Sequence, residues 1–385
     1  MLACRPDDPA VPPQITLVEG STRKVCQLTG ETDRQFMSPA HNLTVTRYGV
    51  YGTDLGQVFE HAGVMWFLFG DTYLNLQYLG GDSIGYSADP EPEDCVDLDF
   101  VADAECRYLP PRVPGIGHGF FEVPAEGVGR GASQFIYFTG NDPNGTEMTR
   151  SYLARTDDFG RTFELVYENS TDKFVNLSGE VVDPLDLPGF GQHQGDIWIY
   201  VGSGTYRGSD PCMAYVPLDD IEDHAEIRYL TGLDATGCYP DWSPHEEDAA
   251  PLFDHPVIGE VSLTYNELLG CWLMLYNAWD MGPHTVIALR AAPFPWGPWS
   301  EPLVVFDPVR DDAFCNYIHV PWNIEHCDNL HELPFRENEW GGSYGPYVIE
   351  RFTKPTSEGA IIYFNMSTWI PYQVVLMAAE LRIAD

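Results

Sequence analysis

Short apolar runs recur along the chain in groups of three. The middle run of each group is four residues long and rich in aromatic and β-branched side chains, which is the composition of a buried strand. The middle runs occupy residues 66–69, 135–138, 198–201, 272–275 and 361–364, and successive runs start 63 to 89 residues apart. Almost no helical periodicity accompanies them, so we expect an all-β chain.

Each middle run is preceded by a strand-like run and followed, after a polar gap, by another apolar run. The preceding runs cover residues 55–60, 120–123, 180–182, 261–265 and 347–349. The following runs cover residues 84–86, 152–154, 213–215, 286–288 and 374–376. Five copies of such a unit are typical of a five-bladed β-propeller. A β-sandwich or an irregular β-helix is the alternative, but neither arranges strands in triplets at this spacing.

We therefore predict one propeller domain over residues 14–385, preceded by a signal remnant or linker over residues 1–13. Residues 14–48 contain strand-like pieces but no copy of the unit, so we expect them to add the missing outer strand of the last blade and close the ring. In residues 156–163 the pattern is that of an Asp-box turn, with Asp158 accepting from backbone donors and Gly160 at a positive φ. We interpret this turn as structural.

The first copy carries the candidate chemistry. Residues 50–73 predict a hairpin whose two-residue turn is Ala62-Gly63, and this turn sets a register that places Asp54 opposite Asp71. Cβ atoms of directly opposed residues lie about 4.5–5.5 Å apart, and like charges there are destabilising. A proton-transfer site is one reason to keep such a pair. The alternative is that one Asp caps a turn and the register differs by one residue.

The innermost strand of each blade lines the central channel of a propeller, so polar residues where those strands begin converge at one end of the axis. The candidates from the later copies are His118, Glu180, Glu260, Tyr344 and Tyr347. The other candidate substrate-binding residues are Arg47, Trp369, Tyr372 and Gln373. Carboxyl groups, a His and Tyr side chains around one mouth match the needs of a glycosidase, which uses an acid, a base and surfaces for a sugar.

Several other chemistries are excluded. The sequence has no Gly-x-Ser-x-Gly elbow, phosphate loop or dinucleotide fingerprint. The 58 acidic residues outnumber 20 basic ones, and a formal charge of −38 would repel a phosphate backbone. Solubility or a saline habitat explains this acidity, a cationic substrate is the weaker alternative, and a neutral polysaccharide is compatible with either. We expect no cofactor, although the channel carboxylates leave a structural calcium ion open.

The cysteines point to an oxidising compartment. The chain starts Met-Leu-Ala-Cys, which resembles the end of a bacterial lipoprotein signal with Cys4 as the lipidated residue; an ordinary chain start is the alternative. Eight cysteines remain. The sequence contains no C-x-x-C pair, so a zinc site is not expected. The disulfides we predict are Cys95–Cys106, Cys212–Cys238 and Cys315–Cys327, with Cys26–Cys271 as the remaining pair. Together with the absence of a membrane-spanning stretch, they predict a monomer outside the cell or on its surface.

Motifs at both ends of the repeat array carry a resemblance to a known family. Gly-Thr-Asp-Leu-Gly at 52–56 and Phe-Gly-Asp-Thr at 69–72 resemble the N-terminal signature of a propeller family first catalogued as a domain of unknown function. Tyr-Gly-Pro-Tyr at 344–347 and the stretch 367–377 resemble its C-terminal end. That family is now glycoside hydrolase family 183, whose characterised members are endo-D-arabinanases.

The resemblance covers residues 44–382. It implies a five-bladed propeller and hydrolysis within the D-arabinan of mycobacterial arabinogalactan or lipoarabinomannan. It also identifies Asp54 and Asp71 as the acidic residues that matter.

The sequence thus predicts a secreted or surface-anchored, endo-acting glycoside hydrolase of an arabinofuranose polymer. Asp54 and Asp71 are the expected catalytic pair, and Glu260 is the third candidate. Carboxyl groups about 5–5.5 Å apart would retain the anomeric configuration, and groups about 6.5–9.5 Å apart would invert it. By analogy with other five-bladed arabinanases we favour inversion, with Asp54 as the base and Asp71 or Glu260 as the acid. The alternative is a non-catalytic glycan-binding propeller at the cell surface.

Overall fold

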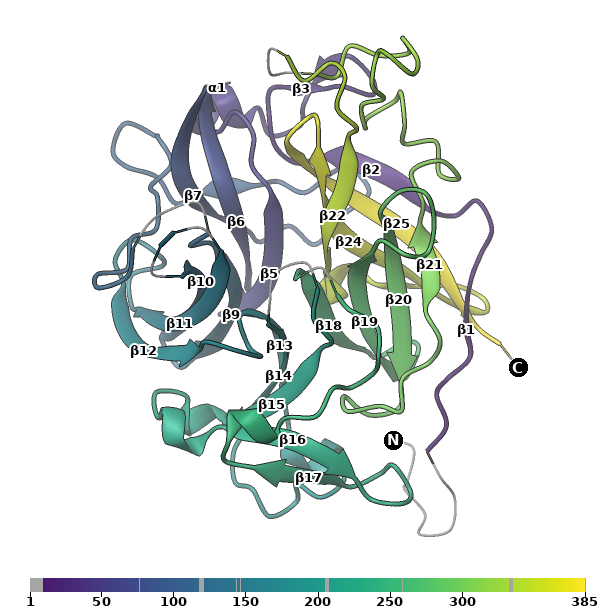
Figure 1. Ribbon diagram of the computed structural model, residues 1–385. Helices are drawn as coiled ribbons and strands as arrows, with labels where there is room; N and C mark the ends of the chain where they lie inside the picture. Colours follow the sequence, from purple (N-terminus) through teal and green to yellow (C-terminus); the bar gives the residue numbers. More distant parts are fainter. Residues whose placement is uncertain are drawn as a thin grey trace.

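The structure is a computed structural model. It describes residues 10–75, 77–117, 121–142, 144–145, 147–204, 208–257, 259–331 and 335–384. Five sheets stand around a central axis, as Figure 1 shows, and each sheet is a blade of antiparallel strands. The predicted all-β, five-bladed propeller is therefore confirmed. Among the described residues, no helix is long and apolar enough to cross a membrane.

The first three blades follow one another along the chain. Blade 1 consists of β5 (Leu55–His61), β6 (Val64–Asn75), β7 (Tyr78–Ser87) and β8 (Asp99–Phe100). Blade 2 consists of β9 (Pro124–Arg130), β10 (Ser133–Asn141), β11 (Met148–Thr156) and β12 (Glu164–Ser170). Blade 3 consists of β13 (Asn176–Val182), β14 (Ile197–Ser203), β15 (Cys212–Pro217), β16 (Arg228–Leu233) and β17 (Pro240–Ser243).

The last two blades complete the ring. Blade 4 consists of β18 (Val261–Asn266), β19 (Cys271–Ala278), β20 (Val286–Ala292) and β21 (Leu303–Phe306). Blade 5 consists of β22 (Gly342–Val348), β24 (Gly359–Trp369) and β25 (Gln373–Ile383), with β23 (Lys354–Pro355) at its edge. The N-terminal strands β1 (Ile15–Leu17) and β2 (Arg23–Gln27) both pair with β25, so the N-terminal segment closes the ring as predicted.

Three short elements lie outside the blades: the pair β3 (Thr32–Asp33) and β4 (Ser38–Pro39), and the helix α1 (Thr44–Tyr48) just before blade 1. Single-turn 3-10 helices stand at Pro184–Asp186, Leu218–Asp220, His224–Glu226, Glu246–Asp248 and Glu350–Phe352.

The five innermost strands form the wall of the channel. β5 contacts β9 and β22, and β13 contacts β9 and β18, while β18 also contacts β22. The order of the blades around the axis is therefore their order in the chain. The middle strands β14 and β19 are buried along their whole length, because each packs on both faces between neighbouring blades. This packing explains why the middle runs were the clearest signal in the sequence.

Three innermost strands begin at places other than those predicted. The first strand of blade 2 is β9, which starts at Pro124, after the predicted run 120–123. In blade 3 the strand starts at Asn176, so the predicted run 180–182 is only its end. In blade 5 the strand β22 starts at Gly342, so the predicted run 347–349 covers only its end. Because β9 and β13 contain polar residues and glycines, they do not stand out as apolar runs in the sequence. The Asp-box turn is confirmed, because Asp158 Oδ1 accepts from the backbone N–H of Arg161 and Thr162.

A β-bulge shifts the register of the first hairpin. The turn at Ala62-Gly63 is as predicted, but the pairing of β5 with β6 slips by one residue after Leu55. Leu55 and Gly56 both have a positive φ, of 61° and 86°, and form the bulge. The N–H of Gly70 donates to the carbonyl oxygen of Asp54 at 3.2 Å. Asp54 therefore lies opposite Gly70, and the predicted direct opposition to Asp71 is wrong by one residue.

The disulfides differ from most of the predicted pairs. Cys315–Cys327 is confirmed. Cys26 of β2 bonds to Cys95, whereas Cys106, Cys212 and Cys271 are free thiols, so the other three predicted pairs are wrong. The physical reason is ring closure, which brings β2 next to the segment after β7 although 69 residues separate the two cysteines. The two disulfides between described residues, Cys26–Cys95 and Cys315–Cys327, indicate an oxidising environment.

Candidate active site

The channel has two chemically different ends. At one end the innermost strands begin, and an apolar layer of Leu55, Val123, Val175 and Tyr347 packs across the channel. We call this end the mouth. Because neighbouring strands of a blade are antiparallel, the β6–β7, β19–β20 and β24–β25 connections also lie on the mouth side. The other end, where the innermost strands finish, opens into a cavity of about 1370 Å³ that we call the distal pocket.

Asp54 stands at the mouth, immediately before β5. The Tyr344 hydroxyl donates to its Oδ2 at 2.9 Å, and the Tyr372 hydroxyl lies beside the same carboxyl group. Among the described residues no donor reaches Oδ1, although this atom is buried. A Cβ at Gly70 would come within 2.5 Å of Oδ1, so only glycine leaves room for it. Asp54 is therefore held through Oδ2, whereas its buried Oδ1 has no hydrogen-bond partner among the described residues.

Asp71 of β6 shares this environment. Burial raises the pKa of Asp54 to about 6, against hydrogen bonds from Tyr372 and Tyr344 that stabilise its charged form. Burial also raises the pKa of Asp71 to about 7, and the negative charge of Asp54 adds to the rise. Two interacting carboxyl groups that titrate near neutral pH are poised to exchange protons with a ligand.

A third carboxyl group belongs to the same cluster, and sequence reasoning missed it. Asp82 of β7 is 5% exposed. Its pKa lies well above the ordinary value, first because of burial and then because of the charges of Asp71 and Asp54, while Arg112 opposes the rise. The sequence feature that could have identified Asp82 is an acidic residue in a strand with no other charged side chain, directly after Gly80 and Gly81.

Aromatic side chains flank the carboxyl cluster on the blade 5 side. Tyr372 makes edge-to-face contacts with Tyr73 at 5.4 Å and with Trp369 at 5.8 Å between ring centroids. The guanidinium group of Arg336 lies over the Trp369 ring, 4.5 Å from its centroid. Tyr372, Trp369 and Tyr344 thus occupy the neighbourhood predicted for them, and Tyr73 and Arg336 join them.

The other candidates from blades 4 and 5 are Glu260 and Tyr347. Glu260 precedes β18 at the mouth end of blade 4, which is not adjacent to blade 1 in the ring, and its Oε2 accepts from Asn277 Nδ2 at 3.1 Å. Tyr347 is 3% exposed and packs in the apolar layer of the channel. His118, the candidate from blade 2, lies outside the described residues.

Two predicted substrate-binding residues hold the fold together instead. Arg47 of α1 pairs with Asp99 on β8, the outermost strand of blade 1, and so lies away from the channel. Gln373 is 3% exposed, and its amide group is engaged on both sides. Its Oε1 accepts from the Thr29 hydroxyl at 2.8 Å, and its Nε2 donates to the Tyr51 carbonyl oxygen at 3.1 Å. Gln373 therefore ties the N-terminal segment to the residues before Asp54.

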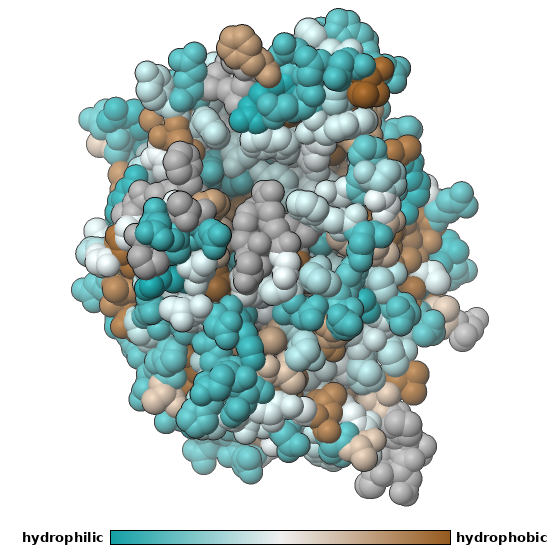
Figure 2. All heavy atoms as spheres, in the orientation of Figure 1, coloured by the Kyte–Doolittle hydropathy of each residue, from teal (hydrophilic) through white to brown (hydrophobic). Residues whose placement is uncertain are grey.

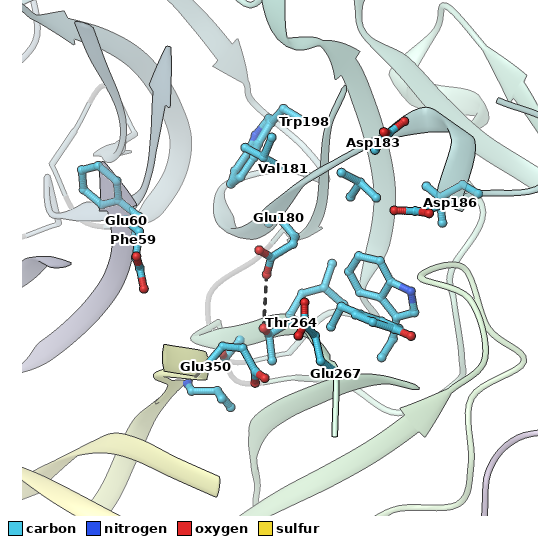
Figure 3. Close-up of a pocket in the computed structure, with 18 of the residues that line it drawn as sticks. Phe59, Glu60, Glu180, Val181, Asp183, Asp186, Trp198, Thr264, Glu267 and Glu350 are labelled. Atoms are coloured by element: carbon cyan, nitrogen blue, oxygen red, sulfur yellow. Dashed lines mark hydrogen bonds between the residues drawn. The ribbon is translucent and has the colours of Figure 1, made fainter. Parts of the chain in front are cut away.

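Glu180 lies in the distal pocket, so its predicted position at the mouth is wrong. It is the fifth residue of β13, and the earlier start of that strand carries it to the far end of the channel. Figure 3 shows its carboxyl group inside the pocket, where Thr264 Oγ1 donates to it at 3.2 Å. Burial raises the pKa of Glu180 to about 8 and that of Glu350, on the same pocket wall, to about 7. The molecule thus has two separate groups of buried carboxyls.

The described carboxyl groups do not form a compact metal site. The one group of three His, Cys, Asp or Glu ligand atoms within 4.8 Å of one another, among the residues described, is Cys315, Glu325 and Cys327. Its two sulfur atoms are joined in a disulfide and are therefore not free thiolates.

Comparison with known proteins places this propeller in a family. The chain matches the family model described as a domain of unknown function, DUF4185, over residues 39–378, and it belongs to that family. A comparison with curated proteins found no match.

Solved structures share the fold at low sequence identity. A Bacteroides ovatus protein provisionally described as a hydrolase superposes with a TM-score of 0.54 at 11% identity, covering 87% of each chain. An exo-β-1,3-galactanase from Phanerochaete chrysosporium gives a TM-score of 0.45 at 9% identity, over 93% of this chain and 64% of the enzyme. The first of these matches supports the propeller fold.

Proposed function

We propose that this protein is an endo-acting glycoside hydrolase whose site is the mouth of the propeller. The observation that carries the proposal is the pair Asp54 and Asp71, two interacting buried carboxyl groups with pKa values of about 6 and 7. A glycosidase needs one carboxyl group that holds a proton near neutral pH and one that does not. Tyrosine and tryptophan rings beside the pair provide surfaces for sugar rings.

The two carboxyl groups take different roles. Tyr344 and Tyr372 favour the charged form of Asp54, which makes Asp54 the general base. Burial and the negative charge of Asp54 raise the pKa of Asp71, and Asp71 acts as the general acid. It gives its proton to the glycosidic oxygen as the bond to the anomeric carbon breaks, while Asp54 takes a proton from the water that attacks that carbon from the opposite face. Asp71 is left ionised and Asp54 protonated, and proton exchange with solvent restores both.

The bulge at Gly56 bears on the stereochemistry. A directly opposed pair would have placed the two Cβ atoms about 4.5–5.5 Å apart, which favours a retaining enzyme. Asp54 instead faces Gly70, and this removes the geometric argument for a close pair. We therefore keep inversion as the proposed outcome. Proton NMR of the first product anomer tests it, because a retaining enzyme would release the opposite anomer.

The substrate class follows from the resemblance of the motifs around Asp54, Asp71 and Tyr344 to glycoside hydrolase family 183. The proposed substrate is an arabinofuranose polymer, D-arabinan of mycobacterial arabinogalactan or lipoarabinomannan. An extracellular or surface location, which the disulfides support, would give access to such a polymer.

Product release from purified arabinogalactan tests the function. We expect oligosaccharides from the wild type and a loss of at least about a hundredfold in rate for Asp54→Asn and Asp71→Asn. Glu180→Gln is the matched control, because it also replaces a buried, high-pKa carboxyl group but lies in the distal pocket. Undiminished release by Asp54→Asn, or loss of release by Glu180→Gln in a folded protein, would overturn the assignment. A wild type that binds the polymer without cleaving it would be a glycan-binding propeller.

A further inference from the structure

Two exposed tryptophans lie on the mouth side of blades 4 and 5. Of the ten tryptophans in the chain, Trp279 is 55% exposed and Trp340 is 41% exposed, and no other is among the exposed large hydrophobic residues. Trp279 lies on the β19–β20 connection, and Trp340 lies just before β22. Both positions are on the mouth side, because β19 ends there and β22 begins there. Large aromatic surfaces left in water are candidates for a binding surface.

Trp340 belongs to a packed trio of rings. The centroid of its ring lies 4.6 Å from that of His284 and 5.2 Å from that of Phe314, and the His284 and Phe314 centroids are 4.8 Å apart. We call these three residues the aromatic platform. His284 comes from the β19–β20 connection, whereas Phe314 and Trp340 come from the long segment between β21 and β22. Two separate segments of chain thus converge to support one exposed indole.

The platform stands on rigid backbone. Phe314 is next to Cys315, which is bonded to Cys327, and the N–H of Cys315 donates to the carbonyl oxygen of Ile318 at 3.0 Å. On the other side Gly341, the neighbour of Trp340, donates its N–H to the His319 carbonyl oxygen at 3.0 Å. Side chains held in this way lose little freedom when a ligand stacks on them, which favours binding.

The platform is connected to the carboxyl cluster through the start of β22 and its partner strand β24. Gly342, two residues after Trp340, pairs with Trp369 across β22 and β24. Trp369 contacts Tyr372, and Tyr372 lies beside the Asp54 carboxyl group. The start of β22 and the ring contact between Trp369 and Tyr372 therefore link the platform to the carboxyl cluster.

We propose that the aromatic platform, with Trp340 as its contact residue, is a remote subsite for a sugar unit of the polymeric substrate, separate from the unit that is cleaved. This inference rests on the proposed function, since its ligand is the same polysaccharide chain. An indole face presents a flat apolar surface that matches the C–H face of an uncharged sugar ring. The arrangement explains how the protein engages the interior of a long chain: catalysis takes place beside Asp54 while another unit of the same chain is held at Trp340.

Chain-length dependence tests the subsite. The substrates are purified arabinogalactan and the shortest linear arabinofuranosyl oligosaccharide that the wild type cleaves. For Trp340→Ala we expect kcat/KM to fall about tenfold on the polymer, mainly through KM, and to stay within about twofold on the short oligosaccharide. Trp340→Phe, which keeps an aromatic ring, should recover most of the loss. Equal effects on both substrates, or none on the polymer, would overturn the subsite.

Phe159→Ala is the matched control, because Phe159 is a 57% exposed aromatic residue in the turn between β11 and β12, on the side opposite to the mouth. It should leave both substrates unaffected.

A binding measurement separates failure of the subsite from failure of the proposed function. In a native gel containing arabinogalactan, Asp54→Asn should be retarded, and Asp54→Asn combined with Trp340→Ala should lose most of that retardation. This comparison works even if the wild type cleaves nothing, a result that would reject the hydrolase but not the subsite. Equal retardation of the two variants, or of neither, rejects the subsite whatever the enzymatic result.

Discussion

The hydroxyl group of Tyr344 donates a hydrogen bond of 2.9 Å to Asp54 Oδ2, across a sequence separation of 290 residues. This bond joins the first residues of blade 5 to those of blade 1, where the ring closes. A hydroxyl donor stabilises the charged form of a carboxyl group and opposes the rise in pKa that burial causes. The Tyr344 side chain therefore links the contact between blades 5 and 1 to the protonation state of the proposed base.

Tyr344→Phe should shift the pH dependence of catalysis. Without this donor, less opposes the effect of burial on the pKa of Asp54, so that pKa rises. The acidic limb of the kcat/KM profile then moves to higher pH. A hydrogen bond to a charged group contributes about 1.5–3 kcal/mol, so activity below neutral pH should fall at least about tenfold. A full pH–rate profile measures both effects. Tyr317→Phe, at another buried tyrosine, is the control, and an unshifted acidic limb in Tyr344→Phe would show that the bond does not tune Asp54.

Gly70→Ala should disable the site while leaving the fold intact. A Cβ at Gly70 would lie 2.5 Å from Asp54 Oδ1, so the carboxyl group must turn away. Displacement of a base by about an ångström reduces the rate on the order of a hundredfold, and we expect this loss in kcat.

Gly63→Ala controls for the loss of a glycine. Gly63 has a φ of 80° in the β5–β6 turn, but no atom lies within 4 Å of its added Cβ. This variant should lose about 1 kcal/mol of stability and keep its kcat. Normal kcat in Gly70→Ala would contradict the position assigned to the Asp54 carboxyl group.

The bulge at Gly56 is a feature that could not be predicted from the sequence. Apolar runs and the Ala62-Gly63 turn predicted the blades and the first hairpin, because burial and turn chemistry are local signals. A single extra residue at Leu55–Gly56 shifts the pairing of Asp54 by one position without changing the apolar pattern. What holds it is distant in sequence: Ser367 Oγ accepts from the N–H of Leu55 at 2.7 Å. No pattern within β5 and β6 reports that contact.

Asp82, Glu180 and Cys95 were misjudged for related reasons. Asp82 is polar inside a strand, and its importance appears only when β7 is placed beside β6. Glu180 depends on where β13 begins, and the start of that strand is poorly marked because Asn, Ser and Gly occupy three of its first four positions. Cys95 finds its partner through ring closure, not through proximity in sequence. In each case the missing information is a contact between segments that are separate in the chain.

The Cys26–Cys95 disulfide should stabilise the fold more than Cys315–Cys327. A disulfide restricts the unfolded chain in proportion to the logarithm of the loop that it closes. The separations of 69 and 12 residues correspond to about 4.4 and 2.8 kcal/mol in that model. The double variant Cys26→Ser/Cys95→Ser should therefore lower the urea midpoint more than Cys315→Ser/Cys327→Ser. The opposite order would mean that β2 does not hold the ring closed.

Asp71 should make the protein less stable at alkaline pH. Its pKa rises from an ordinary 3.8 to about 7 in the folded state, so between these values the folded chain binds more protons than the unfolded one. Stability then falls as pH rises through this window, and the penalty is absent below about pH 4 and complete above about pH 7. Asp71→Asn removes the titration. Its free energy of unfolding should match that of the wild type near pH 4 and exceed it increasingly up to pH 8.

Urea unfolding at pH 4.5, 6 and 8 measures this difference, and subtraction of the wild-type curve cancels the titrating groups that do not interact with Asp71. Asp94→Asn, at an exposed carboxyl group, is the control for the loss of one acidic side chain. A flat difference for Asp71→Asn would mean that Asp71 is ionised at no penalty in the folded protein. It would then lack the retained proton that its proposed role as general acid requires, and the acid would have to be sought at Asp82 or Glu260.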